Sequence, residues 1–279
     1  MSPLARLVQS LQVTADKDRH FIGQPSTNDF HVYGGLILSQ AIDAARQCSP
    51  SNYALQSLHG QFLRPGIAKE NIQIRVDDLK DGRRFKIFNV YCEQQGKTIF
   101  FATVTFHLPE QSFEHTRKAP ALSLPAEDKA TLFIDRMTPL PEDKTRDDAA
   151  LEVRIEDINK FDIELKPEQI TWFKTADDTL ALTHWQQTLL LAYCSDWNLP
   201  TVALRPHIIT EDQKLKAASL DHSIWFYQQA QLDNWAAHVK DSPAAQGGRG
   251  HSRGLFYSAT GDLLACVNQE SFMVAMDKS

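Results

Sequence analysis

The chain has 279 residues, of which 42% are hydrophobic, and a formal net charge of −6. This length suffices for one large domain or two of ordinary size, with enough apolar residues for a core. No apolar run approaches the roughly 20 residues that a membrane-spanning helix needs, and the acidic balance argues against a protein that binds a long nucleic acid. The amino terminus lacks the apolar stretch of a secretory signal, and the four cysteines are scattered singly. We therefore expect a cytoplasmic protein without a metal site.

The first part of the chain predicts a central helix followed by an antiparallel meander. Small and apolar side chains recur every three or four positions from Gly35 to Gln47, which indicates a helix packed on several sides. Turn signals rich in Gly, Pro and Asp then separate four strand-like stretches, at about 54–64, 69–80, 84–95 and 98–108.

The pattern of helix and strands restarts after a change in composition. Residues 109–150 carry five prolines among many charges and few aromatic residues, which is typical of a linker. Beyond it we expect strands at 151–158 and 168–175, a helix from Asp178 to Asp196, and strands at 215–229, 233–241, 249–258 and 262–274. The sequence therefore predicts an α+β fold with two halves, residues 1–108 and 151–279.

A local similarity between the halves indicates an internal repeat. If residues 58–63 are laid on residues 221–226, His59 aligns with His222. The hairpin glycines Gly96 and Gly261 then follow the two histidines after similar intervals. A helix wrapped by a sheet cannot cover both faces of that sheet, so two copies side by side would complete each other. The alternative is a pair of unrelated α+β domains.

Asp196 lies at the end of the second predicted helix, on its apolar face. Trp185, Leu189, Ala192 and Tyr193 share that face, because they follow the helical period of about 100° per residue. A carboxylate on a packed face needs hydrogen-bond partners or a function. Alternatively, the helix ends earlier and Asp196 belongs to the following turn.

The run from Ser219 to Ser223 suggests a Ser-His-Asp triad, but strand geometry argues against one. In a continuous strand Ser219, Asp221 and Ser223 share one face. His222 then takes the other face, where it cannot serve either serine as a base. The chain also contains no G-x-S-x-G motif. We therefore interpret His222 as a hydrogen-bonded core histidine.

Other polar candidates lie in the last strands and near strand ends. Gln269 interrupts an otherwise apolar strand, and its amide both donates and accepts hydrogen bonds. The alternative is that Gln269 is an ordinary surface residue. Arg64, Arg249 and Arg253 are candidates for holding phosphate groups, although exposed arginines are usually only solvated.

Together these segments resemble the acyl-CoA thioesterase II family over nearly the whole chain. The motifs that carry the resemblance are Tyr33-Gly34-Gly35, Phe62-Leu63-Arg64-Pro65-Gly66, Ser195-Asp196, Leu220-Asp221-His222-Ser223-Ile224-Trp225-Phe226, Arg253-Gly254 and Gln269-Glu270. Each motif is weak alone, but their order and spacing are specific. The resemblance implies a double hotdog, in which two repeats of a long central helix are each wrapped by an antiparallel β-sheet. It also implies hydrolysis of fatty acyl-CoA to free fatty acid and CoA.

The resemblance further implies a site of three side chains, Asp196, Ser219 and Gln269, in the second half. They would hold a water for direct attack on the thioester carbonyl, without an acyl-enzyme, a metal or a cofactor. Backbone N–H groups at the start of a central helix would polarise the carbonyl oxygen. The residues expected to bind substrate are Gly34, Gly35, Arg64, Arg249 and Arg253.

Two other functions fit the same fold. An enoyl-CoA hydratase of the hotdog type would use an Asp and a His on one short segment, whereas Asp196 and His222 are far apart in the chain. A non-catalytic acyl-CoA-binding protein is the second alternative. A double hotdog leaves a sheet face or edge exposed, so we expect a homodimer or homotetramer.

Three positions depart from the family pattern. Leu36 stands where Gln is usual, Ser219 where Thr is common and Ser271 where Gly is frequent. The loss of the polar side chain at position 36 leaves the second half as the expected reactive one.

Overall fold

The computed structural model describes residues 1–25, 31–124, 150–155, 163–210 and 212–277. The helices are α1 (Pro3–Leu11), α2 (Gly34–Cys48), α3 (His184–Ser195) and a short 3₁₀ helix η3 (Pro200–Leu204). The strands are β1 (Val13–Lys17), β2 (His20–Gly23), β3 (Ala54–Phe62), β4 (Ile72–Asp81), β5 (Phe85–Gln94), β6 (Lys97–His107), β7 (Leu151–Ile155), β8 (Glu168–Thr175), β9 (Gln213–Ser219), β10 (Asp221–Phe226), β11 (Ala236–Gln246), β12 (Arg249–Tyr257) and β13 (Leu263–Asp277).

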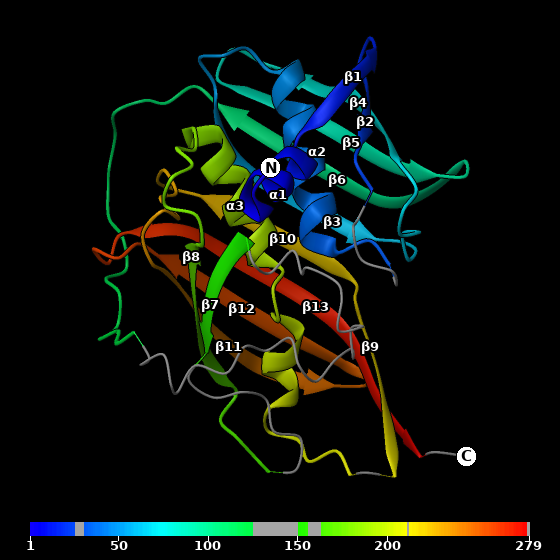
Figure 1. Ribbon diagram of the computed structural model, residues 1–279, viewed down its shortest axis with the longest axis vertical. Coiled ribbons are helices and arrows are strands. Elements are labelled where there is room, and N and C mark those ends of the chain that lie inside the picture. Colours follow the sequence, from blue (N-terminus) through cyan, green and yellow to red (C-terminus); the bar gives the residue numbers. More distant parts are fainter. Residues whose placement is uncertain (26–30, 125–149, 156–162, 211, 278–279) are drawn as a thin grey trace.

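The strands of the described residues form one sheet that runs through both halves of the chain (Figure 1). Its order is β1-β2-β4-β5-β6-β3-β10-β13-β12-β11-β8-β7, with β9 joined to β13. The two halves meet where β3 pairs with β10 in antiparallel register. No helix in the described ranges is long and apolar enough to cross a membrane.

The helix α2 is enclosed on every side. All residues from Gly35 to Ala45 are buried, because small residues such as Ser39 and Ala41 let neighbouring elements approach closely. One continuous hydrophobic cluster includes side chains of α1, α2 and α3 together with both parts of the sheet. The predicted helix at 35–47 and the four predicted strands at 54–108 correspond to α2 and to β3 through β6.

The helices α2 and α3 pack against each other in opposite directions. Three close approaches at four-residue intervals join them: Gly35 to Tyr193, Ser39 to Leu189, and Asp43 to Trp185. Residues four apart lie on one face of a helix, so this series defines an antiparallel contact. The first turn of α2 therefore lies beside the last turn of α3.

The second half differs from the prediction at several element boundaries: the strand predicted at 233–241 is β11, which runs from Ala236 to Gln246, and two further differences have local causes. The helix α3 begins at His184, not at Asp178, because Thr183 caps it. Thr183 Oγ1 accepts from the Gln186 backbone N–H at 3.3 Å, and Gln186 Oε1 accepts from the Thr183 N–H at 2.9 Å, which completes a capping box. The strand predicted at 215–229 is two strands, β9 and β10, separated at Leu220. Of the predicted linker, residues 109–124 contain no helix or strand, and residues 125–149 lie outside the described ranges.

The alignment of His59 with His222 is wrong. Equivalent positions of a repeat should face the same side of the sheet, but His59 is exposed and His222 is fully buried. The two residues lie on neighbouring strands, where His222 pairs with Gly60 and the His59 Nδ1 lies 3.1 Å from Ser223 Oγ.

Candidate active site

Asp196 caps α3 and points its carboxylate at the start of α2. The residue is only 7% exposed, and its Oδ2 accepts a hydrogen bond from the Gly35 N–H at 3.1 Å. A Cβ on Gly34 would lie 2.5 Å from the same oxygen, so this close approach requires glycine. The other oxygen, Oδ1, is buried and has no hydrogen-bond partner among the described residues. As the alternative expected, α3 ends before Asp196, which begins the following turn, but its side chain is buried there.

Burial raises the pKa of Asp196 to about 6. The Gln269 amide and the Gly35 N–H act in the opposite direction, because both favour the ionised form. The positive end of the α2 dipole also favours the ionised form of Asp196. Asp196 is therefore ionised at neutral pH, but its carboxylate binds a proton more readily than an ordinary aspartate does.

Ser219 and His222 face the same side of the sheet, contrary to the prediction from strict alternation. Ser219 pairs with Ser271, whereas Ser223 pairs with Asn268. A step of four residues along β9 and β10 thus opposes a step of three along β13, which is a β-bulge. The extra residue reverses the alternation of faces between Ser219 and His222.

Gln269 connects these two side chains. It is fully buried on β13, so the alternative of a surface residue is wrong. Its Nε2 donates to Ser219 Oγ at 2.5 Å, and its Oε1 lies 3.0 Å from His222 Nδ1. Both hydrogen-bonding ends of the amide are therefore engaged, which holds the side chain in one orientation.

His222 extends this network to α3. Its Nε2 lies 2.9 Å from Ser195 Oγ, and its Nδ1 lies 3.9 Å from Asp196 Oδ1. Burial lowers the pKa of His222 to about 4, which makes the ring neutral at physiological pH. The interpretation of His222 as a buried, hydrogen-bonded histidine is confirmed. Its hydrogen-bond partners are Ser195, which directly precedes Asp196, and Gln269.

Known proteins are similar to this chain over nearly its whole length. Residues 23–107 match the family model of the acyl-CoA thioesterase N-terminal domain, and residues 141–272 match that of acyl-CoA thioesterase. Acyl-CoA thioesterase 2 of Haemophilus influenzae is 35% identical over 279 residues, with 97% of each chain covered. The chain belongs to the acyl-CoA thioesterase family.

Solved structures agree with this assignment. The thioesterase is 27% identical to an acyl-CoA thioesterase II from Mycobacterium marinum, with a TM-score of 0.79 and coverage of 96% of this chain and 98% of that one. A protein described as having a hot dog fold, from Alicyclobacillus acidocaldarius, is 20% identical with a TM-score of 0.74, covering 96% of this chain and 97% of that one. The latter likeness is one of fold.

Two arginines expected to bind substrate in the thioesterase are exposed and contact neighbouring groups. Arg64 Nη1 donates to the Thr98 carbonyl oxygen at 2.7 Å. Arg249 Nη1 lies 3.5 Å from Glu270 Oε1. Neither contact joins the arginine to the Asp196 carboxylate.

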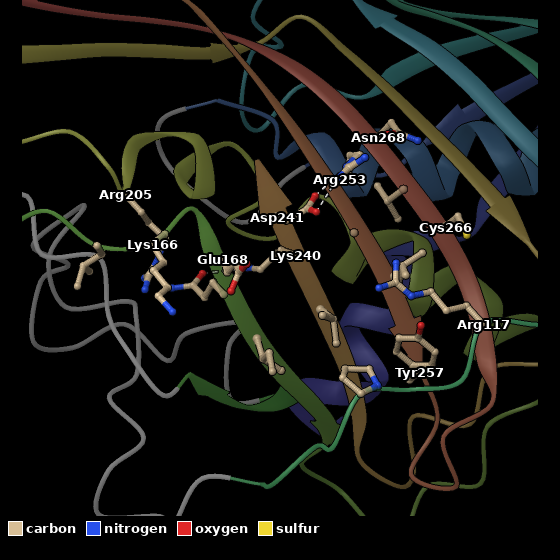
Figure 2. A pocket seen from close by; sticks show the side chains of 18 residues that line it. Arg117, Lys166, Glu168, Arg205, Lys240, Asp241, Arg253, Tyr257, Cys266 and Asn268 are labelled. Atoms are coloured by element: carbon tan, nitrogen blue, oxygen red, sulfur yellow. Dashed lines mark hydrogen bonds and ion pairs between the residues drawn. The ribbon is translucent and has the colours of Figure 1, made fainter. Parts of the chain in front are cut away.

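The third arginine, Arg253, lies on the other face of the sheet. On β12 it follows Ser252, which pairs with Gln269, so alternation directs the Arg253 side chain away from the Gln269 face. Its guanidinium binds the Asp241 carboxylate through two hydrogen bonds, at 2.6 and 2.8 Å. Arg253 and Asp241 line a cavity of about 800 Å³ together with Tyr257 and Arg117. Figure 2 shows these side chains.

Sequence reasoning misses one residue of the candidate site and the contact that a second residue makes there. The sequence marks Ser195 only as the neighbour of Asp196, although its hydroxyl contacts His222. Gly35 is predicted to bind substrate, whereas its N–H bonds the Asp196 carboxylate. A serine on the buried side of an apolar helix is a usable signal for the first, since buried hydroxyls need partners. No local pattern signals the second, which depends on the packing of two helices.

Proposed function

We propose that this thioesterase hydrolyses fatty acyl-CoA to free fatty acid and CoA by direct attack of a water, without an acyl-enzyme. The observation that carries the proposal is the buried, unpartnered Oδ1 of Asp196 within the network that includes Gln269 and Ser219. A buried carboxylate oxygen that has no partner among the described residues needs an explanation, and a substrate water supplies one. Asp196 is the base, and Ser219 and Gln269 hold the water.

The reaction balances with these groups alone. The water oxygen bonds to the thioester carbonyl carbon while one water proton passes to Asp196 Oδ1. The tetrahedral intermediate then collapses, the carbon–sulfur bond breaks, and the thiolate takes the proton from Asp196. The products are the fatty acid and the CoA thiol, and Asp196 returns to its ionised form.

The start of α2 supplies the electrostatic part of the proposal. Gly34 and Gly35 lie against Asp196, so the thioester carbonyl would reach the positive end of the helix when the water reaches the carboxylate. The Gly35 N–H already binds Asp196, and the Leu36 and Ile37 N–H groups bond the Tyr33 carbonyl oxygen, so the helix dipole would supply the stabilisation of negative charge on the thioester oxygen. The acyl chain would occupy an apolar slot between sheet and helix.

We assign the nucleotide phosphates to exposed arginines. Arg64 follows the end of β3 and Arg249 begins β12, and both side chains are exposed, so they could meet a nucleotide at the surface. Arg253 would take part only if the nucleotide also reached the outer face, where this side chain is paired with Asp241.

The decisive experiment measures thiol release from saturated acyl-CoAs of several chain lengths. Replacement Asp196→Ala should remove most turnover while the circular dichroism spectrum and thermal transition persist. Ser219→Ala should lower kcat more than the matched Ser223→Ala, because Ser223 contacts His59 and not Gln269. Full activity in Asp196→Ala would end the proposal.

The same assay separates the alternatives. Hydration of crotonyl-CoA without thiol release would identify a hydratase, and binding of acyl-CoA with neither reaction would identify a binding protein. A serine-directed covalent inhibitor should have no effect, and a stable acyl-serine adduct would contradict the direct-water mechanism.

We further infer a double hotdog in which α2 and α3 are the equivalent central helices of residues 1–108 and 151–279, with 109–150 as linker. The order of strands supports this inference, because β3 and β10 join two similar meanders at the centre of the sheet. Among the described residues, β1, β7 and β9 each pair with one strand only, and such sheet edges support assembly into a homodimer or homotetramer. A monomer by light scattering would contradict that expectation. A cytoplasmic location also stays a prediction, which cell fractionation tests.

A further inference from the structure

His222 bridges the helix that ends at Asp196 and the strand that carries Gln269. The ring is fully buried. Its Nε2 lies 2.9 Å from Ser195 Oγ on α3, and its Nδ1 lies 3.0 Å from Gln269 Oε1 on β13. Both ring nitrogens are therefore engaged, one by each element of the site.

The proton on the ring follows from the nature of these partners. An amide oxygen can only accept, so Nδ1 carries the proton in the contact with Gln269. A neutral imidazole has one N–H, so Nε2 then accepts a hydrogen bond from the Ser195 hydroxyl. The same hydroxyl donates to the Ala192 carbonyl oxygen at 2.7 Å, so its one proton is shared between two acceptors.

The orientation of the Gln269 amide depends on that proton. With Oε1 held by Nδ1–H, the NH₂ group of Gln269 faces Ser219 and donates to its oxygen. If Nδ1 lost its proton, two acceptors would face each other, and a half-turn of the amide would relieve the repulsion. Oε1 would then face Ser219, and the hydroxyl would have to donate to Gln269 instead of to the water.

We propose that His222 is a positioning residue of this thioesterase, whose Nδ1 locks the Gln269 amide in the orientation that leaves the Ser219 hydroxyl proton for the attacking water. Ser195 fixes the ring through Nε2. The inference rests on the proposed role of Gln269 and Ser219 in holding that water.

Burial alone does not demand this arrangement, as a second histidine of the same sheet shows. His238 on β11 is also fully buried, and its ring stacks on Phe256 with the centroids 3.9 Å apart. Neither nitrogen of His238 has a hydrogen-bond partner among the described residues. A buried histidine of this fold can thus serve packing alone, which makes His238 the matched control.

Two amide substitutions separate the roles of the two ring nitrogens. The amide of asparagine sits at the distance of Nδ1 from the backbone, and that of glutamine sits at the distance of Nε2. We expect His222→Gln to lower kcat by about tenfold or more with little change in KM, which is the scale of one lost hydrogen bond to a buried group. His222→Asn should recover most of that loss. In the control pair, His238→Asn and His238→Gln should have equal kcat values.

A double-mutant cycle tests whether His222 acts through Gln269. In a Gln269→Ala background, His222→Gln should cause no further loss of kcat, because the amide that it positions is gone. Additive losses would overturn the proposal, and so would equal kcat values for His222→Asn and His222→Gln.

A measurement on the unaltered protein keeps the inference testable if a variant fails to fold. The ¹⁵N chemical shifts of labelled histidine distinguish protonated from bare ring nitrogens, and at pH 7 His222 should carry its proton on Nδ1. A proton on Nε2 would overturn the proposal. Failure of the proposed direct-water mechanism would be detected separately, because the Asp196→Ala variant would then keep full activity.

Discussion

Replacing Asp196 by asparagine should remove a pH-dependent destabilisation of the folded protein. The pKa of Asp196 is raised from its usual 3.8 to about 6. One pKa unit corresponds to about 1.4 kcal/mol, so keeping this carboxylate ionised in the fold costs ~3 kcal/mol relative to the unfolded chain. The asparagine side chain would retain an oxygen for the Gly35 N–H but could not ionise.

The direction of this pH dependence follows from the number of protons that Asp196 binds in the folded and unfolded states. Between pH about 4 and about 6, the unfolded chain has released the Asp196 proton while the folded protein still holds it. The free energy of unfolding of the wild type, measured relative to Asp196→Asn, therefore falls as pH rises through this window. The total fall is ~3 kcal/mol, and it is complete above pH 6.

The assay is urea unfolding of both proteins at pH intervals from about 4 to 7.5, followed by the fluorescence of the five tryptophans. An effect of the substitution that does not depend on pH, such as that of an unpaired amide in the variant, shifts the difference in unfolding free energy equally at every pH and leaves its slope unchanged. If the unfolding free energy of the wild type relative to Asp196→Asn stayed constant or rose with pH, the raised pKa of Asp196 would be refuted. Turnover should be lost in the variant at every pH, because asparagine cannot accept the proton.

The other predictions concern the reaction and two backbone positions. The kcat/KM of the wild type should fall tenfold per pH unit below about pH 6, because the proposed base Asp196 becomes protonated; a flat profile down to pH 4.5 would contradict this role. Gly34→Ala should lower turnover by tenfold or more, since its Cβ would lie 2.5 Å from Asp196 Oδ2, and a variant with normal kcat would show that the carboxylate can shift freely. Asn198 has a φ of 53°, so Asn198→Gly should unfold with ~1 kcal/mol more free energy than Asn198→Ala; equal melting temperatures would count against that strain.

Much of the fold was predictable because it rests on local periodicity. The apolar pattern of α2 and the turn signals around β3 to β6 mark those elements in the sequence itself. The start of α3 was also readable, since Thr183 and Gln186 have the spacing of a capping box. The apolar stripe on α3 correctly indicated that Asp196 is buried.

The geometry of the site was less accessible, for reasons of register and packing. The bulge between Ser219 and His222 exists only relative to β13, and residues on one strand do not reveal how many face them on the next. The contact between Gly35 and Asp196 depends on how two helices distant in sequence pack against each other. The family resemblance supplied the grouping of Asp196, Ser219 and Gln269, which no local pattern contains.

The antiparallel contact of α2 and α3 also affects how many substrate molecules each chain can bind. It creates two junctions at which one helix starts beside the end of the other, and Asp196 occupies the first. At the second, the start of α3 is closed by its capping box, and the Trp185 indole N–H donates to Asp43 Oδ1 at 2.7 Å. The polar groups described at that junction bond to one another, and Asp43 has no buried carboxylate oxygen without a partner like that of Asp196. A non-hydrolysable acyl-CoA analogue should therefore saturate at one molecule per chain, however many chains assemble.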